Sequence, residues 1–271
     1  MIPPSRETPS SSLPTFGDLL PRTFTHLDRL LVLALVPLAT SVLNVSDLLA
    51  TAQSRGMSIS ASFPIYRYDL WSFVNAPDDG GLTVSVPFGT MESVILAVPL
   101  LVTYLVISGV LSAGYFGSIA SGITTGSFDF IANLRKFAVR MIALEVLVVV
   151  GLLVVFFPLL VVPPLFVLAI FLLLVVGYLL FPAVYVLVLE DRGIESAIRR
   201  AYGLVSEHQP IWFFLTLVVA TLVCAIPLSV LAHSGISGAI IAVIVAAPIS
   251  LAFNVTTALM VAEMAGLEVL E

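Results

Sequence analysis

The sequence predicts an all-α, polytopic integral membrane protein, and three observations lead to this prediction. The stretch from Val146 to Leu189 contains no Asp, Glu, Lys or Arg, and as a helix it is long enough to cross the roughly 30 Å hydrocarbon core of a bilayer twice. The chain is 59% hydrophobic and only 10% charged, whereas soluble domains carry about 25% charged residues. Several separate apolar runs share this excess, which indicates one membrane domain and not a soluble domain with an anchor.

Paired prolines divide the long apolar stretch. Pro163 and Pro164 lack backbone donors and disfavour helix in the residue before them, so we expect the chain to turn there. The same pattern over the whole chain predicts a single domain over residues 15–271, after a flexible Ser- and Pro-rich tail over residues 1–14. We expect six transmembrane helices as three hairpins, with spans at about residues 30–50, 92–116, 141–162, 165–189, 211–232 and 236–262.

An amphipathic segment precedes each expected hairpin. Apolar and polar residues alternate at helical spacing in Thr15–Arg29, Gly126–Arg140 and Glu190–Pro210, which predicts three helices lying at the membrane interface. With six spans, all basic residues except Arg55 and Arg67 fall on the side of the two termini. The positive-inside rule then places both termini and the three interfacial helices in the cytoplasm, for a multi-pass protein of the cell membrane.

The loop from Thr51 to Thr90 is the longest hydrophilic segment between spans. It contains two stretches in which apolar and polar residues alternate, on either side of a turn-rich centre from Asn75 to Gly81. This alternation favours a small β-hairpin outside the membrane.

Small residues recur every fourth position in two of the expected spans, and such stripes let helices approach closely. Because the two stripes are similar, one interpretation is that these two spans pack against each other. The structural interpretation of a stripe is packing within the chain, and the functional one is a dimer seam or a sliding surface. Polar residues at the end of the last span, from Asn254 to Thr257, predict interhelical hydrogen bonds. The stripes consist of Gly109, Ala113, Gly117 and Ser121, and of Gly238, Ala242, Ala246 and Ser250.

Glu145 is the one acidic residue placed inside an apolar run, and a carboxylate in a membrane span is a functional candidate, here for transport coupling. The alternative is structural, because Glu145 lies near the expected cytoplasmic end of its span, where it can reach headgroup water or pair with Arg140. The basic residues of the interfacial segments are candidates for contact with anionic lipid. These are Arg135, Lys136, Arg140, Arg199 and Arg200.

No residue set assigns a catalytic, cofactor-binding or metal-binding site. The sequence contains no phosphate-binding loop, nucleophile elbow or zinc-protease motif, and its three histidines are scattered. A net charge of −6 without a basic patch does not suit nucleic-acid binding. We therefore expect no cofactor and no enzymatic activity.

The segment Glu190–Phe214 (EDRGIESAIRRAYGLVSEHQPIWFF) combines an acidic turn, a short amphipathic helix opened by Ser196 and Ala197, and an aromatic start to the next span. In this respect the chain resembles a group of prokaryotic six-span proteins. The group includes uncharacterised archaeal membrane proteins and the membrane domain attached to some glycerophosphoryl diester phosphodiesterases. The resemblance implies an α-helical integral membrane protein, and the hydrolytic activity does not carry over because the catalytic domain is missing from this sequence.

Together these observations predict a non-enzymatic membrane protein that organises lipid or serves as an accessory subunit of a membrane complex. Its expected partners are the lipid bilayer and another membrane protein or a second copy of the chain. The first alternative is a transporter for a small solute or lipid, in which proline-kinked spans move around the small-residue stripes and Glu145 couples the movement. The second alternative is an intramembrane enzyme, which requires polar residues that no motif identifies here.

Overall fold

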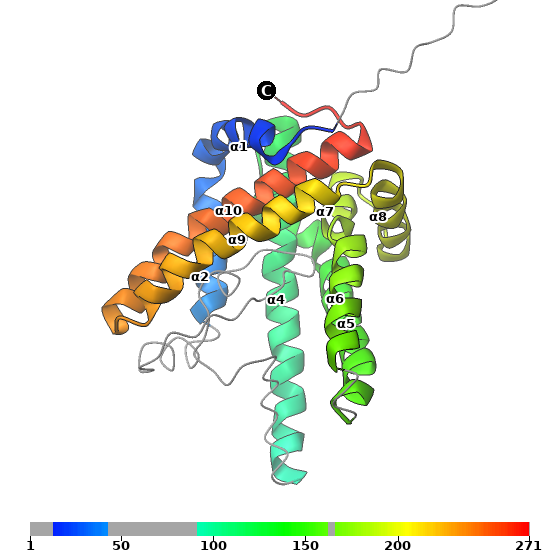
Figure 1. Ribbon diagram of the computed structural model, residues 1–271, viewed down its shortest axis with the longest axis vertical. Helices are drawn as coiled ribbons and strands as arrows, with labels where there is room; N and C mark the ends of the chain where they lie inside the picture. Colours follow the sequence, from blue (N-terminus) through cyan, green and yellow to red (C-terminus); the bar gives the residue numbers. More distant parts are fainter. Residues whose placement is uncertain (1–12, 43–90, 162–165, 271) are drawn as a thin grey trace, which may run out of the picture.

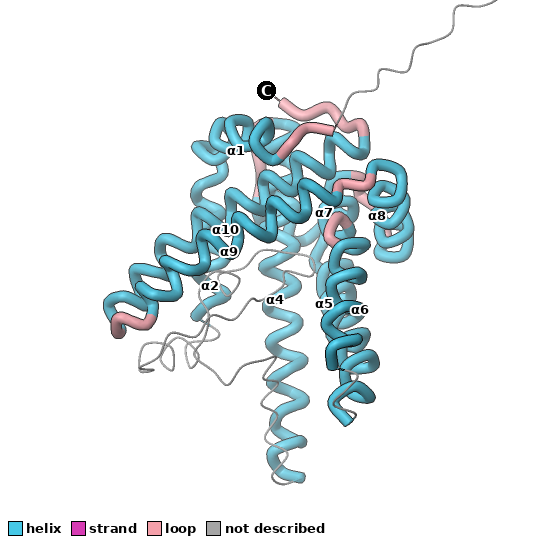
Figure 2. Tube along the Cα trace, in the orientation of Figure 1, coloured by secondary structure: helices cyan, strands magenta, loops and turns pink. Residues whose placement is uncertain are grey.

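The computed structural model describes residues 13–42, 91–161 and 166–270. This part of the chain is helical and contains no β-strand, as the tube in Figure 2 shows. The expected β-hairpin within residues 51–90 and most of the expected N-terminal tail lie outside the described residues. The helices are α1 (Phe16–Leu30), the 3-10 helix η1 (Leu31–Ala34), α2 (Leu35–Val42), α4 (Met91–Thr125), α5 (Phe130–Val161), α6 (Phe166–Leu180), α7 (Ala183–Leu189), α8 (Ile194–His208), α9 (Ile211–Ala232) and α10 (Ile236–Ala265).

Five segments of the described chain are long and apolar enough to cross a membrane, which confirms the predicted class of all-helical, membrane-compatible protein. They are Phe16–Thr40, Leu101–Thr125, Phe130–Val154, Ile211–Ala232 and Ile236–Ala265.

The expected span over residues 165–189 is interrupted. Helix α6 ends at Leu180 and α7 begins at Ala183, with Phe181 and Pro182 in the turn between them. Pro182 has no N–H to continue the hydrogen-bond ladder of α6.

Two of the three segments expected at the interface form separate helices. Figure 1 shows α1 lying across the end of the molecule that holds the C-terminus, while α2 leads away from that end beyond η1. Helix α8 is bounded by Gly193 and by Gln209, which has the left-handed φ of 47°. The middle segment is different, because α5 runs without a break from Phe130 through Arg140 to Val161. No Pro or Gly lies between residues 130 and 150 to end the helix earlier.

The helices gather at one end of the molecule and diverge from it. Figure 1 shows α4, the α5–α6 pair and the α9–α10 pair extending away from the end where α1, α8 and the C-terminus lie. The core lies at this gathered end, where the six residues from Ala183 to Val188 of α7 are all buried. Since successive helix residues point in different directions, α7 is covered on every side. It contacts α4, α8 and α10.

Candidate functional site

A buried carboxylate joins α4 and α5. Glu145 of α5 is only 3% exposed, although it sits in an apolar stretch of the helix. Its Oε1 accepts hydrogen bonds from the hydroxyls of Ser108 at 3.2 Å and Ser112 at 3.0 Å. The two serines are four residues apart on α4, so their side chains lie on the same face of that helix.

Glycines on α4 explain why such short side chains reach α5. A Cβ atom at Gly109 would lie 2.7–2.9 Å from Ile142, two of the three atoms being backbone atoms. At Gly117 it would lie 2.8 Å from the Cβ of Asn133. The missing side chains allow the two helices to approach closely. Ile142 lies three residues before Glu145, so the close approach falls on the face that carries the carboxylate.

This arrangement compensates part of the cost of placing a carboxylate among apolar helices, because two hydroxyl donors meet one oxygen. Arg140, the partner suggested by its position one turn earlier, forms an ion pair with Asp191 at 2.6 Å. The sequence thus identified the buried acid, but the serine partners come from another helix.

A second polar cluster joins three helices around Asn254 of α10. The hydroxyl of Tyr185 on α7 donates to Oδ1 of Asn254 at 2.8 Å. Nδ2 of Asn254 donates to the hydroxyl of Tyr115 on α4 at 3.2 Å and to the carbonyl of Ser250 at 2.9 Å. All four residues are buried. The expected interhelical hydrogen bonds therefore exist at Asn254. The two tyrosines lie within apolar runs, and no local sequence signal marks them as its partners.

Polar contacts also hold α1 against α10. The buried hydroxyls of Thr23 and Thr256 lie 2.9 Å apart, and Arg22 forms an ion pair with Glu263 at 2.5 Å. These contacts attach the helix that lies across the gathered end to the last turns of α10.

The two small-residue stripes occupy different places. On α4, Gly109 and Gly117 face α5, and Oγ of Ser121 accepts a hydrogen bond from Asn133 at 3.0 Å. On α10, Gly238 lies against the end of α9, where a Cβ would meet the carbonyl of Leu231. The remaining members are buried: Ala113, Ala242, Ala246 and Ser250. The contacts found at the glycines are made within the chain, each with the neighbouring helix in sequence.

The basic residues expected at the interface mostly have acidic partners. Asp191, in the turn after α7, accepts from Arg140 at 2.6 Å and pairs with Lys136 at 3.0 Å. The Arg140 guanidinium, followed by the Lys136 ammonium, holds the pKa of Asp191 below its ordinary value.

On α8, Arg200 lies 3.3 Å from Glu190, and Arg199 lies 2.6 Å from Glu195. Arg135 is exposed and has no ion pair within the described part of the chain. The ion pairs of Asp191 and Glu190 join α5 and α8 to the turn that follows α7.

The fold and these sites define a class, namely an all-helical protein with several candidate membrane-crossing helices in its described part and a carboxylate buried between two of them. Within residues 13–42, 91–161 and 166–270, no group of three or more His, Cys, Asp or Glu side chains is arranged to hold a metal ion. No protein-family model, no curated protein and no solved structure matches the chain.

Proposed function

We propose that this chain is a non-enzymatic integral membrane protein that acts as an accessory or organising component of a membrane assembly. The observation that carries the proposal is the exposed half of α4. Leu101, Val102, Tyr104, Val106 and Ile107 are all exposed there, and only Leu105 in this stretch is buried.

Consecutive helix residues are separated by about 100° around the axis. The exposed residues of this half of α4 therefore cover nearly its whole circumference, whereas the residues from Ser112 to Ala120 are all buried. A helix of another subunit, or of a second copy, can pack on this half of α4 without displacing a contact made within the chain. Membrane helices associate through van der Waals packing of this kind.

The proposed topology has six spans in three hairpins, with both termini in the cytoplasm and the protein in the cell membrane. The distribution of basic residues supports this orientation. The position of α1 across the gathered end and the separate α8 support two interfacial helices, while the third segment is the first part of α5. The relationship to the prokaryotic six-span proteins stays a prediction.

The experiment is purification from native membranes in mild detergent, with quantitative proteomics on the same sample. We expect a stoichiometric partner protein or a second copy of the chain. Val102→Trp should reduce the recovery of this partner about tenfold, because an inserted ring in a packed interface costs about 1–3 kcal/mol. Val154→Trp, at an exposed valine of α5, is the matched control and should retain the partner.

Two outcomes contradict this function. One is a wild-type chain that purifies alone and as a monomer. The other is an equal loss of the partner in the Val102 and Val154 variants, which would indicate a general defect in place of a binding face on α4.

A proton-coupled transporter is the second candidate, and the geometry of Glu145 favours it. Glu145→Gln keeps an oxygen that accepts from Ser108 and Ser112 but removes the exchangeable carboxyl proton. Flux of an identified solute should then lose its dependence on pH, while Glu207→Gln on the exposed side of α8 should leave it unchanged. Flux through the Glu145 variant that follows pH as in the wild type would exclude the coupling role.

A further inference from the structure

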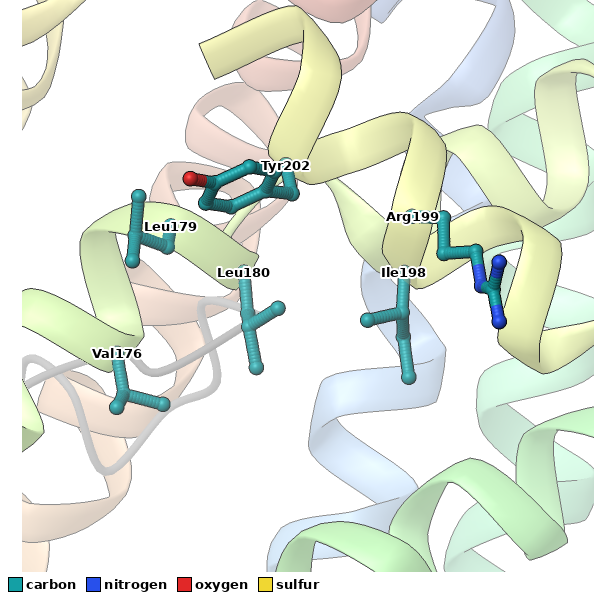
Figure 3. A pocket seen from close by; sticks show the side chains of 6 residues that line it. All are labelled: Val176, Leu179, Leu180, Ile198, Arg199 and Tyr202. Atoms are coloured by element: carbon teal, nitrogen blue, oxygen red, sulfur yellow. The ribbon is translucent and has the colours of Figure 1, made fainter. Parts of the chain in front are cut away.

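An open hollow of about 400 Å³ lies between α6 and α8. It is lined by Val176, Leu179, Leu180, Ile198, Arg199 and Tyr202. Figure 3 shows the three α6 side chains on one side and Ile198 of α8 across from them, with the guanidinium of Arg199 pointing away from the apolar side chains. The hollow is therefore apolar inside and has a cation at its rim.

The two walls differ in their surroundings. Helix α6 belongs to the uncharged stretch and exposes Phe171, Leu172 and Val175 on its outer surface. Helix α8 carries exposed charged residues, including Glu195 and Arg199. The hollow thus lies where apolar surface meets charged surface, which in a membrane corresponds to the boundary between acyl chains and headgroups.

The charge of Arg199 is available to a further anion. Its partner is Glu195, one helical turn earlier at 2.6 Å, and both side chains are 79% exposed. An ion pair exposed to this degree contributes little and is easily exchanged. A phosphate group offers the planar guanidinium a bidentate partner.

We propose that this hollow binds one anionic phospholipid, with part of an acyl chain between α6 and α8 and the phosphate on Arg199. The volume falls within the range of small-molecule sites. The apolar lining matches an acyl chain, and the cation at the rim matches the phosphate. The inference rests on the proposed membrane location, and it names a site for the contact with anionic lipid that the sequence predicts at Arg199.

The test is native mass spectrometry of the full chain from vesicles of phosphatidylcholine and phosphatidylglycerol. We expect one retained phosphatidylglycerol per chain. Arg199→Gln should weaken retention about tenfold, because a charge-assisted hydrogen bond is lost. Arg29→Gln is the matched control, since it removes the same charge from an exposed position on α1 outside the hollow and should retain the lipid.

A second charge variant distinguishes lipid binding from damage to the fold by the direction in which lipid retention changes. Glu195→Gln removes the carboxylate that competes for Arg199, so lipid retention should rise about twofold. A structural role for the Glu195–Arg199 pair predicts a loss in both variants instead. A loss of retained lipid in Glu195→Gln therefore overturns the proposal.

Two neighbouring valines test the place of the acyl chain. Val176 lines the hollow and Val175 does not, while their exposed fractions are 39% and 37%. Val176→Trp should fill the hollow and abolish retention, whereas Val175→Trp should retain the lipid. Equal behaviour of the two variants, or equal retention of phosphatidylcholine, overturns the site.

Failure of this site is distinguishable from failure of the proposed function. The partner is measured in the same purification through Val102→Trp on α4, which lies outside the hollow. A chain that retains the partner but no lipid contradicts only the lipid site. A chain that retains the lipid but no partner contradicts only the proposed function.

Discussion

The hydroxyl of Tyr185 donates to Oδ1 of Asn254 at 2.8 Å, joining the short buried helix α7 to α10. The same amide donates to Tyr115, so one side chain connects three helices at the gathered end. Buried polar groups with matched partners specify one arrangement of helices among many apolar alternatives.

Asn254→Leu should therefore destabilise the protein by about 1–3 kcal/mol, because the hydroxyls of Tyr115 and Tyr185 lose a partner inside the core. Reversible unfolding in detergent micelles measures this loss. Tyr185→Phe should give a smaller loss, of about 1 kcal/mol. The control is Tyr202→Phe, which removes an exposed hydroxyl and should leave stability unchanged; equal effects at the two tyrosines would contradict the buried network.

Gly109→Ala should separate α4 from α5. The added Cβ would lie within 2.9 Å of backbone atoms of Ile142, which cannot move away alone. We expect a loss of about 1–3 kcal/mol in the unfolding free energy. Gly151→Ala on α5 is the matched control, because nothing lies within 4 Å of its Cβ, and it should be neutral or stabilise by up to about 1 kcal/mol. A tolerated Gly109→Ala would show that the helices do not approach this closely.

Stability should depend on pH through Asp191. Arg140 and then Lys136 lower the pKa of this carboxyl from its ordinary value of 3.8, so the unfolded chain binds the proton more tightly. The stabilising contribution is present in full above the ordinary pKa and is lost as the pH falls through the lower pKa of the folded state.

Asp191→Asn should remove this contribution, which we expect to be less than about 1 kcal/mol because the side chain is about half exposed. Asn also tolerates the left-handed backbone at this position, where φ is 51°. Unfolding measured at neutral pH and at a pH below the lowered pKa of Asp191 should show a difference from wild type only at neutral pH. A difference that persists in acid would assign the effect to the turn and not to the charge.

Thr23→Val and Thr256→Val should be coupled. Each change removes one hydroxyl of a buried pair 2.9 Å apart, and the double variant should lose less than the sum of the two. We expect a coupling energy of about 0.6 kcal/mol, the average for membrane helices. Unfolding of the wild type, the two single variants and the double variant completes the cycle. Thr216→Val is the control, because this exposed hydroxyl donates to a carbonyl of its own helix α9. Strict additivity would show that the two hydroxyls do not interact.

Much of the fold follows from local pattern. Helix α9 has the bounds expected for its span, since Pro210 precedes it and His233 to Gly235 form the expected turn after it. The division of the expected fourth span was missed, although Pro182 was visible, because proline inside a membrane span is common and breaks the helix only in some contexts. The continuity of α5 was also missed. A separate interfacial helix was expected before the third span, but the amphipathic and apolar segments join without a helix-breaking residue.

The partners of the buried polar groups were not predictable from local sequence. Glu145 was identifiable because a carboxylate stands out in an apolar run. Its contact with Ser108 and Ser112 depends on how α4 packs against α5, and the local pattern suggested Arg140 instead. Asn254 is a similar case, since its tyrosine partners are distant in sequence.

The burial of α7 on every side has a consequence for biosynthesis. Its neighbours include α10, which the ribosome makes after α7, so α7 cannot reach its final surroundings before α10 has emerged. Insertion of the earlier helices into the bilayer must come first, and the final docking of α7 must wait for the C-terminal hairpin. Nascent chains arrested before Ile211 should therefore hold α7 in a lipid-accessible state, open to a membrane chaperone until α10 has been made.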